Sequence, residues 1–136
     1  GGTTDLATAR QWQWTISALK NAGLDARQAM AQAQDVLRVT TGRIDQIEGP
    51  GRSYRIHHGH ALMTKVTGLG CASSALVAAC AAVEPDPAVA AAAALTAYGI
   101  AAEIAAGRAA GPGSFAMHLI DALAGLDQAT LTERMT

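Results

Sequence analysis

Apolar residues in the first third of the chain follow helical spacing. Between residues 4 and 21, after the candidate N-cap Thr4, the apolar positions in rough helical register are Leu6, Trp12, Ile16 and Leu19. A similar pattern runs from Asp25 to Leu37. We therefore predict two amphipathic helices, neither with a chemical motif. Trp12 and Trp14 cannot share one helix face, so we expect one in the core and the other exposed or at an interface.

Residues 37–57 change to an alternating pattern. Polar and apolar side chains alternate over residues 43–47 and again over residues 53–56, with Gly49-Pro50-Gly51 between them. Alternation is typical of half-buried strands, and a Gly-Pro-Gly sequence is typical of a turn. The β-branched run Val39-Thr40-Thr41 comes just before. The simplest interpretation is a hairpin of two short strands.

The rest of the chain returns to helical patterns. After a linker over residues 61–67, we expect a helix from Cys71 to about residue 83, where Pro85 breaks it. Ser114 is the expected N-cap of a last helix, which Gly125 ends. The tail to residue 136 is polar, and we expect it to be loosely ordered.

An alanine-rich helix is expected between these two. Pro87 suits its first position, and the pattern continues to about Gly107. Its most apolar stretch, residues 87–102, is short of a membrane span, so we interpret it as a buried helix. Glu84 and Asp86 precede it and are interpreted as loop residues that place charge at the helix start.

Charge and cysteine content narrow the classes of function. The 136 residues fit one domain, and the formal net charge of −1 gives no electrostatic reason to expect nucleic acid or an acidic membrane as partner. Nothing at the start of the chain resembles a signal peptide. Cys71 and Cys80 are nine residues apart, on opposite sides of one expected helix, so they cannot pair. Two free thiols suit a reducing cytoplasm.

The segment Thr67-Gly68-Leu69-Gly70-Cys71 carries the main candidate chemistry. It lies where an extended segment meets a helix, and its glycines let a ligand approach the main chain. The first N–H groups of a helix lack internal partners and favour an anion, such as a phosphoryl group in transfer. Cys71, at the first turn, could accept a proton from a substrate hydroxyl or act as a nucleophile. Taken alone, the segment also fits a helix-opening glycine turn with a buried cysteine.

Other polar residues are weaker candidates. His57-His58-Gly59-His60 could suggest a metal, but neighbouring strand residues point to opposite faces, so a strand end near the mouth of a site is favoured. Lys65 could reach a phosphate, although a solvated lysine is the more common case. Ser73 and Ser74 have no nearby base, which favours helix packing or hydrogen bonding at the helix N-terminus.

Several ordered motifs resemble one family. The run from Gly59 to Cys71, GHALMTKVTGLGC, is similar to the segment of hydroxyethylthiazole kinases that ends in their TGxGC loop. Thr41-Gly42-Arg43-Ile44-Asp45 resembles the TGxxD sequence of that family, with Arg43 where an acidic residue is usual. Tyr98-Gly99 and Gly111-Pro112-Gly113-Ser114-Phe115 resemble its later landmarks. His58 stands where the family more often has Asn.

This resemblance implies an α/β, ribokinase-like fold, here a truncated, helix-dominated form with a short β-hairpin or small sheet. It divides a single domain, residues 1–136, into a divergent helical segment, residues 1–39, and a region over residues 40–126 that resembles the C-terminal half of the family. The family's N-terminal half, with an acidic Mg²⁺-linked motif and an ATP-contacting Arg, has no counterpart in residues 1–39.

The resemblance also implies an activity and a site. The family transfers the γ-phosphate of ATP, with Mg²⁺, to the hydroxyl of 4-methyl-5-(2-hydroxyethyl)thiazole in thiamine salvage, as cytoplasmic trimers with active sites at subunit interfaces. By this resemblance Cys71 is the catalytic base, and Gly68 contacts the thiazole. Thr41 contacts ATP, and the anion hole is formed by Thr67, Gly68, Leu69 and Gly70.

Two other classes of function stay open. One is a catalytically inactive, truncated or rearranged relative that acts as an oligomerising structural protein, because a missing half leaves apolar faces uncovered. The other is a cysteine-dependent enzyme with Cys71 as nucleophile, for which His57, His58, His60 and His118 are available partners.

Overall fold

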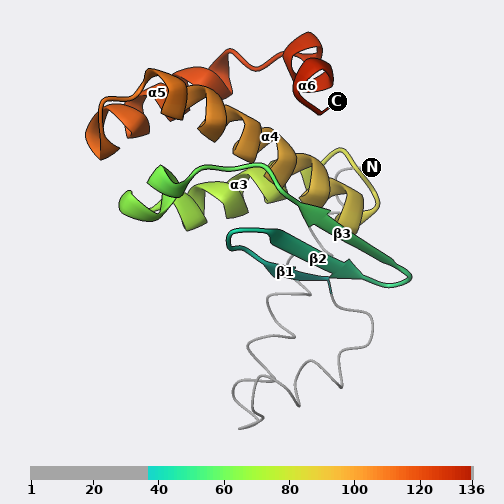
Figure 1. Ribbon diagram of the computed structural model, residues 1–136. Helices are drawn as coiled ribbons and strands as arrows, with labels where there is room; N and C mark the ends of the chain where they lie inside the picture. Colours follow the sequence, from blue (N-terminus) through green and yellow to red (C-terminus); the bar gives the residue numbers. More distant parts are fainter. Residues whose placement is uncertain (1–36, 136) are drawn as a thin grey trace, which may run out of the picture.

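The computed structural model describes residues 37–135, and in this range a small antiparallel sheet is followed by a set of helices (Figure 1). The sheet has the order β1-β2-β3, with strands β1 (Arg38–Thr40), β2 (Asp45–Gly49) and β3 (Arg52–Ile56). The helix predicted over residues 4–21, nearly all of the one predicted over residues 25–37, and both tryptophans lie outside the described residues.

The predicted hairpin is confirmed and gains a third strand. β2 and β3 pair antiparallel, with Ile47 opposite Tyr54, across the turn that the Gly-Pro-Gly sequence predicts. β1 pairs with the other edge of β2, with Val39 opposite Ile47. A strand of three residues is too short to show alternation, which is why the sequence indicated only two strands. Ile47, on the central strand, is fully buried.

The helices are η1 (Ala61–Lys65), α3 (Leu69–Ala81), α4 (Pro87–Arg108), α5 (Pro112–Ala124) and α6 (Gln128–Met135). The linker expected over residues 61–67 therefore contains a 3-10 helix. α3 begins at Leu69, two residues before the expected start at Cys71. The expectation of a loose tail is wrong, because α6 forms there.

Polar side chains fix the starts of three helices. Asp86 caps α4 by accepting hydrogen bonds from the amides of residues 88 and 89, and it pairs with Arg52 at 3.2 Å. Asp127 accepts a bond from Thr130 in the first turn of α6, and hydrogen bonding from Thr130 lowers the pKa of this carboxyl group. Ser114 is not the N-cap of α5. The N-cap is Gly111, and its amide donates a hydrogen bond to the hydroxyl of Ser114, which lies in the first turn of the helix.

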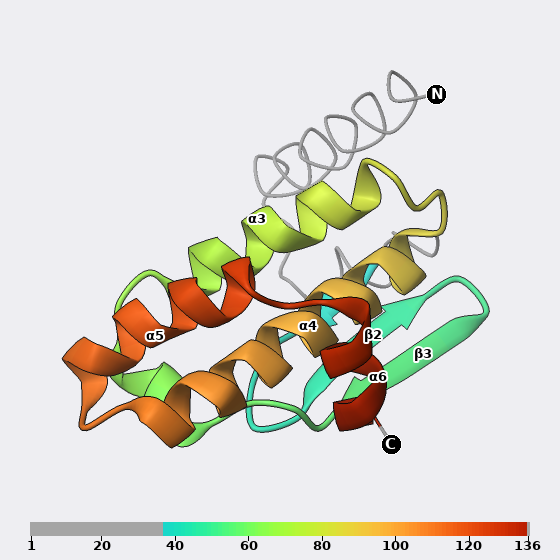
Figure 2. The same ribbon diagram turned by 90° about the horizontal axis from the view of Figure 1, so that it is seen from above.

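Helix α4 is the centre of the molecule. In the two views of Figures 1 and 2 it lies between the sheet and α5, with α3 alongside. The stretch of residues 87–102 was judged short of a membrane span, but the whole helix is long and apolar enough to cross a membrane by length and composition alone. Most of its apolar part is buried, in agreement with the predicted buried helix. Its buried alanines are Ala88, Ala90, Ala91, Ala94, Ala101, Ala102 and Ala105. Small side chains on several faces let neighbouring elements approach closely.

Two separate apolar clusters pack against α4. Toward the sheet, its N-terminal half packs with Ile47 through Ala88, Ala91 and Leu95. Toward α5, its C-terminal half packs against Phe115 and Leu119, with η1 and α3 residues around them. Phe115 is the single phenylalanine of the chain and is fully buried.

Gly99 marks the closest approach to α4. A Cβ built at this position would lie 2.6 Å from the Cβ of His58 and 2.7 Å from its carbonyl carbon. The connection from β3 to η1 therefore rests directly on the helix backbone. At Gly107, on the same helix, an added Cβ would meet no atom within 4 Å among the described residues.

The crowding at Gly99 and the open space at Gly107 give a matched test of the packing against α4. We expect Gly99→Ala to lower the free energy of unfolding by about 1–3 kcal/mol, because backbone must move to admit the methyl group. Gly107→Ala should instead raise it by about 0.5–1 kcal/mol through helix propensity alone. Chemical denaturation of both variants measures the two effects. Equal stability of the two variants would contradict the close approach at Gly99.

Candidate functional site

A cavity of about 590 Å³ opens where three connections meet beside α4. The turn between β1 and β2, the β3–η1 connection and the start of α3 form its walls, and α4 supplies its base. Its lining residues are Thr41, Gly42, Arg43, Asp45, His58, Gly59, His60, Ala61, Met63, Thr64, Leu69, Gly70, Ser73, Leu95, Tyr98 and Gly99. Segments that are far apart in sequence therefore meet around one space that is large enough for a phosphoryl group.

The N-terminus of α3 borders this cavity. Gly68 is the N-cap, with a φ of 90°, a conformation that a residue with a side chain rarely adopts. The first hydrogen bond of the helix runs from the Ala72 amide to the Gly68 carbonyl. The amides of Leu69, Gly70 and Cys71 precede that bond, so helix geometry gives them no internal acceptor. Leu69 and Gly70 line the cavity, where such amides favour an anion.

Hydrogen bonds hold this helix start in place. The Tyr98 hydroxyl, from α4, donates to the Leu69 carbonyl at 3.1 Å. Burial raises the pKa of Tyr98, so the phenol is held neutral. The hydroxyls of Ser73 and Ser74 both donate to the Gly70 carbonyl, at 2.8 and 3.0 Å. The serines thus have the hydrogen-bonding role that the sequence favoured over a nucleophilic one.

The predicted site residues are only partly brought together. Thr41 lines the cavity together with Leu69 and Gly70 of the predicted anion hole. Thr67 and Gly68 are exposed and directly precede α3. Cys71 is a free, exposed cysteine in the first turn of α3, next to Gly70 but outside the set of lining residues. Cys80 is also free, as predicted.

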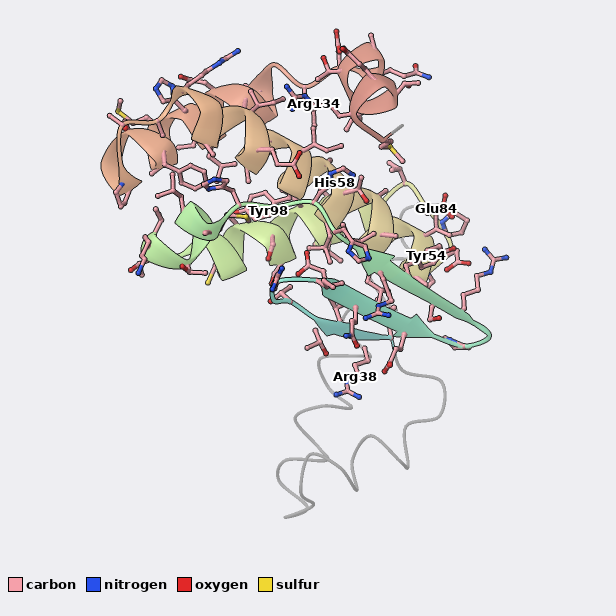
Figure 3. All side chains as sticks on the ribbon, viewed as in Figure 1. Arg38, Tyr54, His58, Glu84, Tyr98 and Arg134 are labelled. Atoms are coloured by element: carbon pink, nitrogen blue, oxygen red, sulfur yellow. The ribbon has the colours of Figure 1, made fainter. Side chains whose placement is uncertain are left out.

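His58 lines the cavity, near the mouth of a site as the sequence analysis favoured, but its partner Glu103 was missed. His58 is labelled beside α4 in Figure 3. Its Nδ1 lies 3.1 Å from Oε1 of Glu103 on α4, and the same oxygen accepts a hydrogen bond from the Gly59 amide at 3.1 Å. His58 and Glu103 are 45 positions apart, so no local pattern in the sequence could link them. Their pairing fixes one wall of the cavity to α4.

The charges around the cavity favour an anionic ligand. Arg43, which is exposed, is the arginine among its lining residues. Asp45 is its lining carboxylate, and Oδ1 of Asp45 is occupied by the Gly42 amide at 2.9 Å. Arg43 and the first amides of α3 are thus the groups at the cavity that could hold an anion.

The three neighbouring histidines do not converge on one point. His58 pairs with Glu103, whereas the His60 ring accepts a hydrogen bond from the Leu62 amide and caps η1. Between residues 37 and 135 there is no group of three or more His, Cys, Asp or Glu side chains placed to hold a metal ion. Lys65, at the end of η1, is exposed.

Comparison with known proteins gives a consistent set of relatives. Residues 14–129 match the model of the hydroxyethylthiazole kinase family. The chain is 47% identical over 112 residues to a hydroxyethylthiazole kinase of Granulibacter bethesdensis, which covers 82% of this chain and 41% of that protein. It is 48% identical over 102 residues to one of Clavibacter sepedonicus, covering 75% of this chain and 37% of that protein. The chain thus spans about two fifths of the length of these relatives.

A solved structure is similar in fold. The hydroxyethylthiazole kinase protein of Pyrococcus horikoshii OT3 superimposes with a TM-score of 0.70 at 30% identity, over 96% of this chain and 46% of that one. The fold is therefore α/β and ribokinase-like, in the helix-dominated form with a small sheet that the sequence indicated.

The Tyr98 bond to the start of α3 can be tested by its pH dependence. Because the pKa of Tyr98 is raised in the fold, its stabilising contribution is complete below the unfolded value of 10.0 and is lost as pH rises through the folded value. We expect Tyr98→Phe to lower the unfolding free energy at neutral pH by about 1 kcal/mol, and to remove part of its fall at alkaline pH. Denaturation at about pH 8 and about pH 11 measures both effects.

Tyr54→Phe, a variant of the half-buried tyrosine on β3, is the control. If Tyr98→Phe and Tyr54→Phe reduced the fall of the unfolding free energy at alkaline pH equally, the neutral Tyr98 phenol would have no special part in holding α3.

Proposed function

We propose, since the chain belongs to the hydroxyethylthiazole kinase family, that it transfers the γ-phosphate of ATP to the hydroxyl of 4-methyl-5-(2-hydroxyethyl)thiazole in thiamine salvage. The main support is the start of α3, where Leu69 and Gly70 border a cavity that Thr41 also lines. Amides at a helix start can hold the transferring phosphoryl group and stabilise the charge that grows on it.

The proposed reaction needs an attack on the γ-phosphorus, a base for the hydroxyl proton, and groups that hold the two substrates. The hydroxyl oxygen of the thiazole alcohol attacks the γ-phosphorus, and the bond from that phosphorus to the bridging oxygen of ADP breaks. The hydroxyl proton passes to the thiolate form of Cys71, which becomes the thiol; Cys71 is next to Gly70 in the first turn of α3. Gly68 contacts the thiazole, and Thr41, across the cavity, contacts ATP. Thr67, Gly68, Leu69 and Gly70 form the anion hole.

Magnesium enters the proposal as the counter-ion of ATP. Mg²⁺ is commonly held by one or two carboxylates together with substrate phosphates. Asp45 is the carboxylate that lines the cavity, and it already accepts a bond from Gly42. Within residues 37–135 no group of three or more metal ligands gathers, so Mg²⁺ would be held by Asp45 together with the phosphates of ATP, whose charge it would partly neutralise.

Assembly as a cytoplasmic homotrimer is the second part of the proposal. Its support is α3, in which no residue from Leu69 to Ala81 is charged although much of the helix surface is exposed. An uncharged exposed helix face is a common feature of an interface. Mass measurement in solution tests the assembly. An assembled protein without turnover would instead favour the non-enzymatic, oligomerising class.

The role of Cys71 is tested by two substitutions and a matched control. In an ATP-dependent assay on the thiazole alcohol, we expect Cys71→Ala to lower kcat by about 10²–10⁴-fold, because the general base is lost. Cys71→Asp should keep measurable turnover, since a carboxylate can accept the same proton. Cys80→Ala, a variant of the other free cysteine on α3, should leave kcat unchanged. No turnover by the folded parent protein would reject the kinase proposal.

Arg43 is expected to bind the polyphosphate of ATP. Arg43→Gln should raise the KM for ATP by about tenfold, with little effect on the KM for the thiazole alcohol, because a charge-assisted hydrogen bond is removed. Arg55→Gln, on the exposed side of β3, carries the same change in charge outside the cavity. Equal KM values for ATP in the two variants would show that Arg43 makes no phosphate contact.

A further inference from the structure

One carboxylate holds the β3–η1 connection to α4. Oε1 of Glu103 lies 3.1 Å from Nδ1 of His58 and accepts the Gly59 amide at 3.1 Å. Both side chains are half-buried, with exposed fractions of 27% for His58 and 31% for Glu103. Because an ionised carboxylate only accepts hydrogen bonds, Nδ1 must carry the hydrogen of this pair. Nε2 is then the ring nitrogen left for a ligand of the cavity that His58 lines.

The same segment is fixed at a second point. The Cβ and the backbone of His58 rest on Gly99, so close that an added methyl group there would lie 2.6 Å from the histidine Cβ. Gly99 and Glu103 are four positions apart on α4 and therefore lie on one face of the helix. The histidine is thus held at its backbone by a glycine and at its ring by a carboxylate, one helical turn apart.

We propose that Glu103 is a positioning residue, which holds the His58 imidazole so that Nε2 donates a hydrogen bond to a phosphate oxygen of the bound nucleotide. This inference rests on the proposed phosphotransfer for the identity of the ligand. Donation from both ring nitrogens needs the imidazolium form, so the ring takes up a proton when the phosphate binds. Carboxylate on one side and phosphate on the other stabilise that cation.

Other ionisable groups around His58 are accounted for. Arg43 lines the cavity from the β1–β2 turn, Asp45 from the start of β2, and Tyr98 from α4. His60, on the same connection as His58, has its Nδ1 occupied by the Leu62 amide. His60 is the other histidine that lines the cavity, so it needs a control variant.

The activity-free test uses inorganic phosphate as the probe. Phosphate is titrated into the full chain at about pH 6.5, near the ordinary titration midpoint of histidine, while the ring nitrogens are followed by ¹⁵N NMR. We expect the His58 Nε2 signal to move toward the protonated position as phosphate is added. The movement should be lost in Glu103→Ala and kept in Asp127→Ala, which also loses a carboxylate bond to a backbone amide but lies at the start of α6.

The second test separates positioning from folding through the KM for ATP. At about pH 6.5 we expect Glu103→Ala and His58→Ala to raise this KM by about tenfold, with kcat changed less. Glu103→Gln should have a KM for ATP close to that of the parent at low pH, because the amide oxygen of Gln can still accept the bonds from His58 and Gly59. It should not show the parent pH profile, because the negative charge of the carboxylate is gone. His60→Ala should keep that profile. The titration of ATP itself is common to all variants and cancels in their ratios.

The outcomes distinguish this inference from the kinase proposal. A phosphate-dependent shift of His58 without turnover of the thiazole alcohol supports the anion contact and rejects the activity. Turnover of the thiazole alcohol, together with a His58 Nε2 signal that does not move when phosphate is added, overturns the inference and supports the activity. A parent pH profile retained in Glu103→Gln would also overturn it, since the carboxylate would then be merely structural.

Discussion

Close approach to the backbone of α4 is the constraint on which the rest of the structure depends. The helix is buried against the sheet through Ala88 and Ala91, and against α5 through Ala101, Ala102 and Ala105. Each alanine buries little area, so the stabilising contacts come from many neighbours at short range and from a few large side chains such as Phe115. A helix of larger residues would hold its neighbours farther away, and the walls of the cavity would separate.

The cavity is a consequence of this packing. Two of its walls are held to α4 by specific contacts. Tyr98 donates to the Leu69 carbonyl and holds the start of α3, whereas Glu103 and Gly99 hold the segment around His58. The turn with Thr41 and Arg43 follows from the pairing of β1 with β2. Two of the chain connections that line the cavity are thus positioned by one helix, α4.

The sequence predicted the parts that have a local physical signal. Proline and alanine content indicated α4, alternation indicated β2 and β3, and the glycines placed a helix start close to Cys71. It could not reveal β1, which is too short for a periodic pattern, and it missed α6, whose Asp127 cap was overlooked in a polar tail. The meeting of Thr41 with Leu69, and the pairing of His58 with Glu103, depend on contacts between distant segments, for which a single sequence holds no periodic signal.

The two apolar clusters along α4 have a thermodynamic consequence. Because one continuous helix carries Leu95 in the sheet-side cluster and Tyr98 in the cluster against α5, a shift of its axis that relieves crowding on one side opens space on the other. Substitutions in the sheet and in α5 should therefore be energetically non-additive even where their side chains never touch.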